Sequence, residues 1–358
     1  MKILINLGML LDKPTGISNY ALNILPYLKP LEPTLLVGKA KQEYNCRLIA
    51  DNLGPNHGSK GHLRRLIWTE KELPRIYNQE KASLLFSPIP EAPITRKLPY
   101  IVMVHDLIPL RFPRWFSPLT PYFRYYIPRV VKNAEHIICN SVATAKDIQE
   151  FWGINPQRIT PIHLGYDAQH FQLLKNLPPL DVPYFIYLGR HDPHKNLTRL
   201  VTAFAKIADN CQEELWLVGP QDRRYTPQLQ RLAIALDIAS RVKFIDYAPY
   251  SELPRLFNQA TALVFPSLWE GFGLPVVEAM ACGTPVITSN LSSLPEITQD
   301  AAILVNPYQV EDISAAMELL ATDQKRRSRL AELSLRQASQ FSWAKTGEAT
   351  ARVLLGNR

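Results

Sequence analysis

Apolar and polar stretches alternate along the chain as two series of strands and helices. Short apolar runs predict strands at residues 2–7, 33–38, 82–87, 100–104, 137–140 and 158–164, and again at 184–188, 215–218, 242–245, 262–265, 285–288 and 303–305. Amphipathic stretches between them predict helices, and a last helix at residues 343–355 has no strand after it. Such alternation is typical of parallel α/β sheets. The pattern therefore predicts two doubly wound parallel-sheet domains that face each other across a cleft.

The break between the two series is rich in proline and weakly periodic, as linkers are. We therefore predict a Rossmann-like N-terminal domain over residues 1–172, a linker over 173–182 and a Rossmann-like C-terminal domain over 183–341. A chain of 358 residues is long enough for two such cores. Residues 45–61 are polar and are predicted to be an irregular, mobile segment. The pattern leaves open which domain the terminal helix packs on.

The stretch over residues 261–289 reads as strand, loop, short helix, turn and strand. Its helix is predicted to begin near Pro275, because proline is favoured in the first turn, and to end at Gly283. At about 100° per residue, Glu278 points away from the apolar arc of this helix. Glu270, Gly271 and Gly273 precede the helix, where free amides attract anions. A ligand with both hydroxyls and phosphate, such as a nucleotide sugar, fits this pattern, although a lone loop carboxylate is more often a solvated surface group.

The loop over residues 189–196 carries Arg190 and Lys195 on either side of another helix start. A fixed arginine and lysine can stabilise a departing diphosphate without a metal. No Asp-x-Asp pair occurs in the sequence, and His191 and His194 lack partners at zinc-site spacing, so no metal site is predicted. The sequence also lacks the Walker A and Gly-x-Gly-x-x-Gly motifs, which argues against nucleotide hydrolysis and dinucleotide redox chemistry.

Two residues of the first half stand after predicted strands, where ligands of open parallel sheets bind. Gly16 lies near a helix start and is equally compatible with a phosphate contact and a plain turn. His105 ends a buried strand; taken alone, a histidine there is more often a structural residue than a functional one.

The net charge of +8 favours anionic ligands or surfaces. No nucleic-acid-binding motif appears, so nucleic acid is not an expected partner. Residues 111–132 contain five basic and seven aromatic residues and no acid. This segment suits an anionic membrane surface or an acceptor site, and buried aromatics with snorkelling arginines are an equal alternative.

No run of about 18 uncharged apolar residues occurs, and the first residues enter a strand without a signal-peptide pattern. We therefore expect a cytoplasmic protein, with peripheral contact at the inner face of the membrane as an option. The four cysteines have no Cys-x-x-Cys spacing and are read as buried or free thiols.

The motif EGFGLPVVE, with Glu270 and Glu278 as E-x7-E, resembles the signature of retaining GT-B glycosyltransferases of family 4, also called glycosyl transferases group 1. The resemblance extends through AMACGTPVITS, LGRHDPHKN, the VHD that contains His105, and the closing FSW. It implies a GT-B fold, no cofactor, and a GDP- or UDP-sugar as donor. It also implies that the terminal helix, residues 342–358, packs back on the first domain.

The resemblance further implies a role for each matched residue. Glu278 would bind the ribose hydroxyls, Glu270 the donor sugar, and Arg190 and Lys195 the diphosphate. Gly16 would contact the phosphates, and His105 the donor sugar, so for His105 the family match outweighs the interpretation as a structural residue. Backbone contacts to the donor would come from Gly271, Phe272, Gly273 and Leu274.

The implied reaction transfers a hexose, with a lean to mannose, to a glycan or lipid-linked acceptor with retention and without metal. A GT-B-fold epimerase or phosphorylase is the alternative among enzymes. A binding module that senses a nucleotide sugar without turnover is the alternative from another class, and it has no need of the cations at Arg190 and Lys195.

Overall fold

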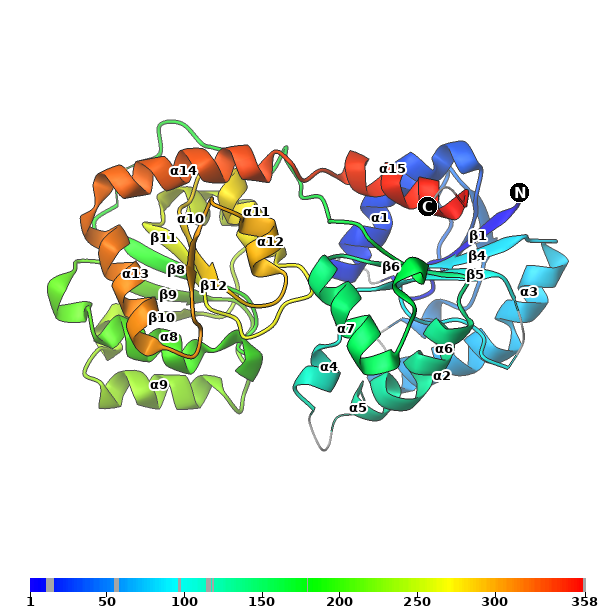
Figure 1. Cartoon of the computed structure of the whole chain (residues 1–358), viewed down its shortest axis with the longest axis horizontal. Coiled ribbons are helices and arrows are strands. Elements are labelled where there is room, and N and C mark those ends of the chain that lie inside the picture. The colour runs from blue at the N-terminus through cyan, green and yellow to red at the C-terminus, as the bar shows by residue number, and fades with distance from the viewer. Residues whose placement is uncertain are drawn as a thin grey trace. The chain divides into compact units, whose positions relative to one another are not determined.

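The computed structural model describes residues 1–10, 16–54, 58–95, 98–113, 117, 119–178 and 180–356 (Figure 1). The chain forms two compact units, Met1–Gly165 with Trp343–Arg358, and Tyr166–Ser342. The boundary thus lies at residues 165 and 166, before the position expected from the sequence. Residues 173–182, which the sequence predicts to be a linker, belong to the second unit.

The first unit is built on a parallel sheet of seven strands in the order β3-β2-β1-β4-β5-β6-β7. Its strands are β1 (Ile3–Asn6), β2 (Thr34–Val37), β3 (Asn45–Leu48), β4 (Leu84–Ser87), β5 (Tyr100–Val104), β6 (His136–Cys139) and β7 (Ile159–Pro161). Every residue of β1, β2, β4, β5 and β6 is buried, as expected for a parallel sheet covered on both faces.

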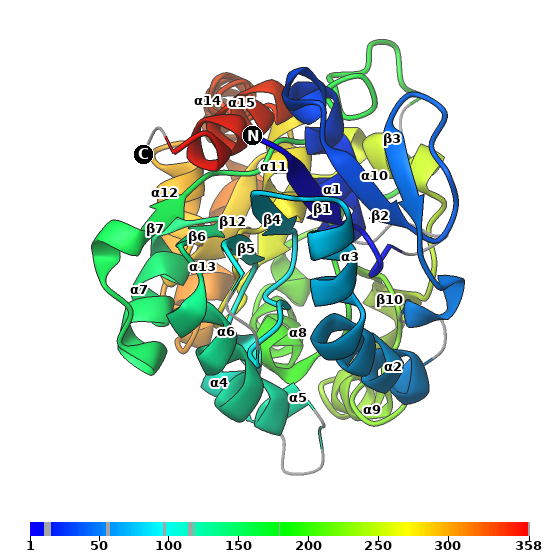
Figure 2. The same cartoon turned by 90° about the vertical axis from the view of Figure 1, so that its right-hand side faces the viewer.

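Helices cover both faces of this sheet (Figures 1 and 2). They are α1 (Gly16–Leu28), α2 (Gly58–Lys71), α3 (Leu73–Gln79), α4 (Ile108–Arg111), α5 (Leu119–Pro121), a π-helical turn (Tyr122–Tyr126), α6 (Ile127–Asn133), α7 (Val142–Trp152) and α15 (Trp343–Leu354). Helices α1 and α15 lie on one face, and α2 and α6 lie on the other.

The second unit has a parallel sheet of six strands in the order β10-β9-β8-β11-β12-β13. The strands are β8 (Tyr184–Leu188), β9 (Glu214–Val218), β10 (Val242–Ile245), β11 (Ala262–Phe265), β12 (Val286–Ser289) and β13 (Ile303–Val305). Its helices are α8 (Leu197–Ala205), α9 (Thr226–Ala235), α10 (Leu253–Gln259), α11 (Leu274–Ala281), α12 (Leu294–Thr298), α13 (Val310–Thr322) and α14 (Gln324–Ala338). Helices α10, α11 and α14 lie on one face and α8, α9 and α13 on the other (Figure 1). The chain therefore has two Rossmann-like parallel-sheet units, as the sequence predicts.

Three details differ from the sequence prediction. The segment predicted to be irregular, residues 45–61, contains the edge strand β3, which pairs with β2 through its backbone. Three of its four side chains are exposed, so it lacks the apolar run that marks a central strand. Residues 62–79, whose sequence predicts one helix, lie in two helices that are divided at Glu72. Pro74 has no N–H to donate to the Glu70 carbonyl, so the helical hydrogen bonds cannot continue across it. The short helix α12 was not predicted.

The terminal helix α15 packs on α1 in the first unit (Figures 1 and 2). Gly347 is the point of close approach, because a Cβ atom there would lie 2.5 Å from the Cβ of Tyr27. The Thr346 hydroxyl also donates a hydrogen bond of 2.8 Å to the carbonyl of His163.

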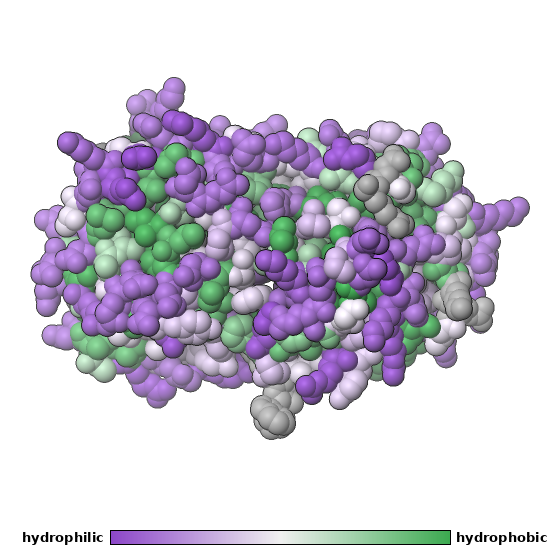
Figure 3. Space-filling model, in the orientation of Figure 1, coloured by the Kyte–Doolittle hydropathy of each residue, from purple (hydrophilic) through white to green (hydrophobic). Residues whose placement is uncertain are grey.

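The surface seen in Figure 3 is mainly hydrophilic, with apolar residues in groups between the polar ones. Within the described ranges, no helix is long and apolar enough to cross a bilayer. All four cysteines are free thiols, and Cys139 and Cys282 are buried.

Candidate active site

The strand order of each sheet reverses at one point, and ligands of open α/β sheets bind outside the carboxyl ends of the strands there. In the second sheet the reversal lies between β8 and β11, which are hydrogen-bonded neighbours. The loop after β8 carries Lys195 and the loop after β11 carries Glu270. Lys195 Nζ lies 2.6 Å from Glu270 Oε1, and the side chains are only 15% and 9% exposed. Lys195 and Glu270, which the sequence analysis placed in two separate loops, therefore meet at this edge of the sheet.

The backbone around Lys195 is held by the residue that follows it. A 3₁₀ turn, Pro193–Lys195, ends at Asn196, whose φ of 63° is left-handed, a conformation that asparagine tolerates. The Asn196 amide donates to the carbonyls of Pro266 and Pro307, at 3.1 and 2.7 Å. One buried amide thus ties together the loops after β8, β11 and β13. The sequence analysis assigned Asn196 no role, although its position just before α8 was the available signal.

Two serines hold the Glu270 loop in a similar way. The Glu270 N–H donates to Ser292 Oγ at 3.1 Å. The Ser293 hydroxyl points to the Glu270 and Phe272 carbonyls, at 3.1 and 2.7 Å. Neither serine belongs to the motif, so the sequence analysis missed both.

The start of α11 requires glycine at position 273. Gly273 has a φ of 108°, and a Cβ atom there would lie 2.9 Å from the Leu294 side chain. Helix α11 begins at Leu274 with Pro275 in its first turn, and Gly283 after it has a φ of 71°. The predictions for Pro275 and Gly283 are confirmed. The N-terminus of α11 presents partial positive charge at the same edge as Lys195.

The motif residues of this loop, from Glu270 to Gly273, are buried. The side chain of Phe272 is 4% exposed and packs edge-on against Phe341, with ring centroids 5.8 Å apart. Gly271 is buried as well. The Phe272 carbonyl accepts a hydrogen bond from the Ser293 hydroxyl, and Leu274 is partly exposed.

Glu278 lies one turn further along α11 and is partly exposed. Burial raises the pKa of its carboxyl from the usual 4.5 to about 7, and the nearby charge of Asp167 adds to this. An acid whose pKa is strongly perturbed at a sheet edge is a candidate for ligand binding. Asp167 was not predicted, and its position before the second strand series gave no signal of this contact.

Arg190 is placed differently from Lys195. Its side chain is 70% exposed, and its Nε lies 3.3 Å from Asp192 Oδ2. The structure therefore joins Lys195 to Glu270 and leaves Arg190 at the surface of the same loop. His191 and His194 are both buried, and His191 Nδ1 lies 2.9 Å from the Thr226 hydroxyl. Over the described residues, no cluster of three or more His, Cys, Asp or Glu side chains is arranged to hold a metal ion.

In the first unit, His105 follows β5 and is partly exposed. Its Nε2 lies 2.9 Å from the Pro88 carbonyl, and Tyr20 contacts its ring edge-on at a centroid distance of 5.2 Å. Burial lowers the pKa of His105 to about 4. Gly16 is the first residue of α1, with open space where a Cβ atom would stand. Both residues follow strands at the carboxyl edge of the first sheet.

The second unit thus offers a partly buried cation, a buried carboxylate, a helix N-terminus and a glutamate with a raised pKa along one sheet edge. A cation beside a helix N-terminus suits a diphosphate, and carboxylates suit sugar hydroxyls. The arrangement can bind a nucleotide sugar and stabilise its leaving group.

Comparison with known proteins gives the same assignment. The model of the family described as Glycosyl transferases group 1 matches residues 169–335, and that of Glycosyltransferase Family 4 matches residues 14–170. The O-antigen chain mannosyltransferase RfbU of Salmonella typhimurium is 26% identical over 330 residues, which cover 88% of this chain and 90% of that protein. The serotype-specific mannosyltransferase WbdA of Escherichia coli is 30% identical over 264 residues, 69% of this chain, but the chain spans only 32% of its length.

Solved structures share the fold at low identity. Sucrose-phosphate synthase from Thermosynechococcus elongatus superimposes with a TM-score of 0.77 at 18% identity, covering 99% of this chain and 98% of that one. Anabaena HepE in complex with UDP and glucose gives a TM-score of 0.75 at 19% identity, covering 99% and 100%. With both family models matched in sequence order and the fold shared over nearly the whole length, the chain belongs to the family 4 group of GT-B glycosyltransferases.

Proposed function

We propose that the protein transfers mannose from GDP-mannose to a glycan or lipid-linked acceptor, with retention of configuration and without a metal ion or cofactor. The observation that carries the proposal is the Lys195–Glu270 pair at the reversal point of the second sheet. The choice of mannose is supported by the relatives RfbU and WbdA, which are named mannosyltransferases. UDP-sugars are the alternative donors.

In this proposal Lys195 and the N-terminus of α11 stabilise the departing diphosphate, and Arg190 reaches the same charge from the surface of its loop. The backbone of Gly271, Phe272, Gly273 and Leu274 lies against the donor. Glu278 accepts hydrogen bonds from the ribose, and Glu270 contacts the transferred sugar. For the first unit we propose that His105 contacts this sugar and Gly16 the phosphates.

Retention follows if the acceptor attacks from the face that the diphosphate leaves. A non-bridging phosphate oxygen then takes the acceptor proton as the glycosidic bond forms and the bond to the diphosphate breaks. No second carboxylate is assigned as a base in this scheme.

Binding identifies the donor first. A thermal-shift panel of GDP-mannose, UDP-glucose, GDP, UDP and ADP reports binding because a ligand that binds the native state raises its stability. We expect the largest shift with GDP-mannose; no shift with any nucleotide sugar contradicts the proposal. A shift without any release of nucleotide in the presence of acceptors favours the binding module.

Product analysis then separates the enzymes. NMR of the first product formed is expected to show the α-anomer, the configuration of the donor. A β-linked product excludes retention, and free isomerised sugar or sugar phosphate favours the epimerase or phosphorylase. Turnover is expected to survive EDTA, and a strict Mg²⁺ requirement refutes the metal-free scheme.

We also propose that residues 119–132 contact an anionic membrane surface. Leu119 and Tyr125 are 46% and 61% exposed, and the cations Arg124, Arg129 and Lys132 are exposed beside them. Arg124 and Lys132 line a cavity of ≈ 420 Å³ with Phe151 and Trp152. Of the predicted segment, residues 114–116 and 118 lie outside the described residues, and Arg111 pairs with Asp147 and Glu150.

Vesicle sedimentation tests the membrane contact. Binding to phosphatidylglycerol vesicles is expected to weaken with salt and to fall in a Tyr125→Ser/Arg124→Gln variant. Equal sedimentation with neutral vesicles, or none with either, contradicts it.

A further inference from the structure

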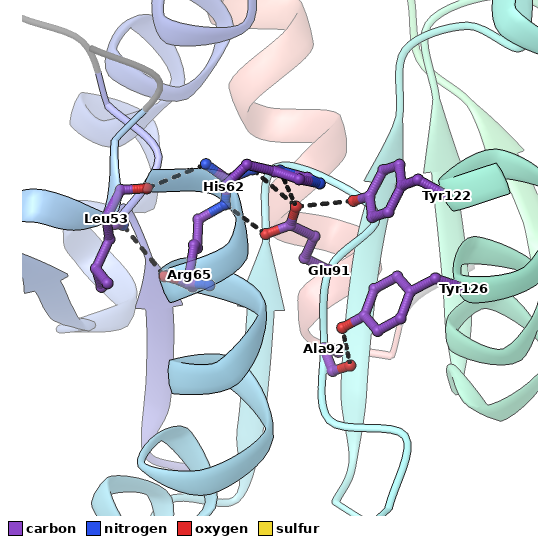
Figure 4. Close-up of polar contacts among 9 residues, drawn as sticks. Leu53, His62, Arg65, Glu91, Ala92, Tyr122 and Tyr126 are labelled. Carbon is purple, nitrogen blue, oxygen red and sulfur yellow. Dashed lines mark hydrogen bonds and ion pairs between the residues drawn. The ribbon is translucent and has the colours of Figure 1, made fainter. Parts of the chain in front are cut away.

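The loop between β4 and β5, residues 88–99, is clamped by a buried ion pair. Arg65 of α2 donates from Nε and Nη2 to the two Glu91 carboxylate oxygens, at 2.6 and 2.8 Å (Figure 4). The Tyr122 hydroxyl, from the π-helical turn, donates to Glu91 Oε1 at 2.8 Å. We call Glu91, Arg65, Tyr122 and His62 the Glu91 cluster; in it, His62 Nδ1 accepts from Arg65 at 2.9 Å.

This cluster brings three segments together at the carboxyl edge of the first sheet. Glu91 follows β4, Tyr122 follows β5, and Arg65 lies in α2, which leads back to the sheet. Glu91 is 1% exposed and Arg65 is 6% exposed. Removing two charges from water costs about as much as their attraction returns, so a buried ion pair is weak evidence for a role in stability alone. The bidentate geometry of the Arg65–Glu91 pair, by contrast, fixes the position of the loop.

A second carboxylate of α2 holds the far end of the same loop. Glu70 accepts hydrogen bonds from the N–H of Ile94 at 3.0 Å and from the hydroxyl of Thr95 at 2.8 Å. The Tyr126 hydroxyl adds a bond of 3.1 Å to the Ala92 carbonyl (Figure 4). The loop is therefore fixed from residue 91 to residue 95.

The first residue of this loop contacts His105. The Pro88 carbonyl can only accept a hydrogen bond, so its 2.9 Å contact with Nε2 requires the proton on Nε2. The other nitrogen, Nδ1, then carries a lone pair. Because burial lowers the pKa of His105 to about 4, the ring is neutral at pH 7 and Nδ1 acts as an acceptor.

We propose that Glu91 is a positioning residue for His105: it fixes the β4–β5 loop so that Pro88 holds the Nε2 proton and Nδ1 accepts a hydrogen bond from a hydroxyl of the donor sugar. The inference rests on the proposed function for the sugar contact of His105. The tautomer, however, is a property of the protein without substrate.

The test measures the tautomer and turnover in the same variants. Long-range ¹H–¹⁵N NMR of protein labelled in its eight histidines reports which nitrogen carries the proton, and His105→Gln identifies the signal. Wild type is expected in the Nε2–H form. In Glu91→Gln we expect a mixture of both tautomers and a fall in kcat for GDP release from GDP-mannose of about 10- to 100-fold, with KM within about twofold.

Tyr122→Phe removes one hydrogen bond to Glu91 and keeps the ion pair, so it tests the inference if Glu91→Gln does not fold. We expect the same shift in the His105 tautomer and the same fall in kcat, each smaller than in Glu91→Gln. Tyr100→Phe is the matched control, because it removes a buried tyrosine hydroxyl that donates to the Val130 carbonyl at 2.8 Å and not to Glu91. It is expected to leave the tautomer and kcat unchanged.

An unchanged tautomer in Glu91→Gln and Tyr122→Phe overturns the inference, and so does an equal change in Tyr100→Phe. Wild-type turnover of GDP-mannose by His105→Gln instead overturns the sugar contact assigned in the proposed function. The two failures are therefore told apart.

Discussion

Two lysines of the second unit each pair with a glutamate and lie over an aromatic ring, but they differ in exposure. Lys195 lies 2.6 Å from Glu270 and 5.5 Å from the ring centroid of Phe265. Lys243 lies 2.6 Å from Glu214 and 5.1 Å from the ring centroid of Trp216, but its side chain is 49% exposed. Lys243 sits in β10, away from the reversal point. Substitutions at these two lysines therefore distinguish the loss of a leaving-group cation from the loss of an ion pair.

Lys195→Ala is expected to lower kcat by about 100- to 1000-fold, the usual effect of removing one donor that stabilises a developing charge. Its free energy of unfolding should fall by about 3 kcal/mol, because Glu270 is left buried without its partner cation. Lys243→Ala should keep wild-type kcat, because Lys243 lies away from the reversal point of the sheet, and its stability should change little because exposed ion pairs contribute little. Steady-state kinetics with GDP-mannose and thermal melts check both variants. Equal kcat in wild type and Lys195→Ala removes the leaving-group role.

Glu278 predicts a pH dependence of donor binding. Its carboxyl pKa of about 7 means that it ionises between pH 6 and 8. The ionised form accepts hydrogen bonds from ribose more strongly, so affinity for GDP-mannose should rise with pH up to about 8, by as much as tenfold per unit below pH 7. The diphosphate diester of GDP-mannose has no proton to lose in this range. Calorimetric titration should show that Glu278→Gln abolishes the rise; a parallel rise in the variant contradicts it.

The same group predicts the opposite trend for stability. The pKa of Glu278 is raised by folding, so between pH 4.5 and 7 the native state binds a proton that the unfolded state has lost. Stability from this group is therefore present at low pH, is lost as pH rises from 4.5 to 7, and is constant above 7. Relative to wild type, Glu278→Gln should gain on the order of 2–3 kcal/mol between pH 4.5 and 8, measured by urea unfolding. A constant difference across this range argues against the raised pKa.

At the scale of the element, helix α11 depends on the glycine before it. Gly273→Ala meets two costs, a left-handed φ of 108° and a contact of 2.9 Å with Leu294. Gly153→Ala, after α7, meets only the first, because its φ is 65° and nothing lies within 4 Å. We expect Gly273→Ala to lose roughly 2–4 kcal/mol of stability and Gly153→Ala roughly 1 kcal/mol.

Donor binding distinguishes the two glycines further. Gly273→Ala is expected to weaken GDP-mannose binding at least about tenfold, since it displaces the N-terminus of α11. Gly153→Ala should bind as wild type does. Similar affinities in the two variants would show that the start of α11 does not meet the donor.

Elements with a strong local signal could be predicted from the sequence. Strands β5, β8, β10, β11 and β13 have the predicted bounds, because each is rich in strand-forming residues and, apart from Lys243 in β10, is apolar. Strand β3 could not be predicted, since its pairing uses backbone atoms and its side chains face solvent. Local patterns report side-chain burial, and an edge strand has little of it.

The site divides in the same way. The motif identified Lys195 and Glu270, and the topology explains why they meet. The residues that hold them, Asn196, Ser292 and Ser293, could not be predicted, because their partners lie in other loops of the sheet edge. Contacts between distant loops depend on the tertiary structure, which spacing along one segment does not encode.

At the scale of the whole molecule, the chain passes through the second unit before it completes the first. Helix α15, at the C-terminal end of the described chain, belongs to the first unit and packs on α1. The first unit therefore depends on residues that follow the entire second unit. A change that affects only this packing should destabilise one unit and spare the other.

Gly347→Ala is expected to disturb only the packing of α15 on α1. A Cβ atom at position 347 would stand 2.5 to 2.7 Å from atoms of the Tyr27 side chain, so α15 must move away from α1. We expect a loss of about 1–3 kcal/mol in the first unit, the usual cost of overpacking. Amide hydrogen exchange should show faster exchange in β1, β2 and α1, with unchanged protection in β8 and β11. The control is Glu348→Ala, an exposed position on the same helix. Because Glu278, the proposed ribose contact, lies in the second unit, guanosine affinity should stay at the wild-type value in both variants. Loss of guanosine affinity in Gly347→Ala alone would mean that the nucleoside site needs an intact first unit.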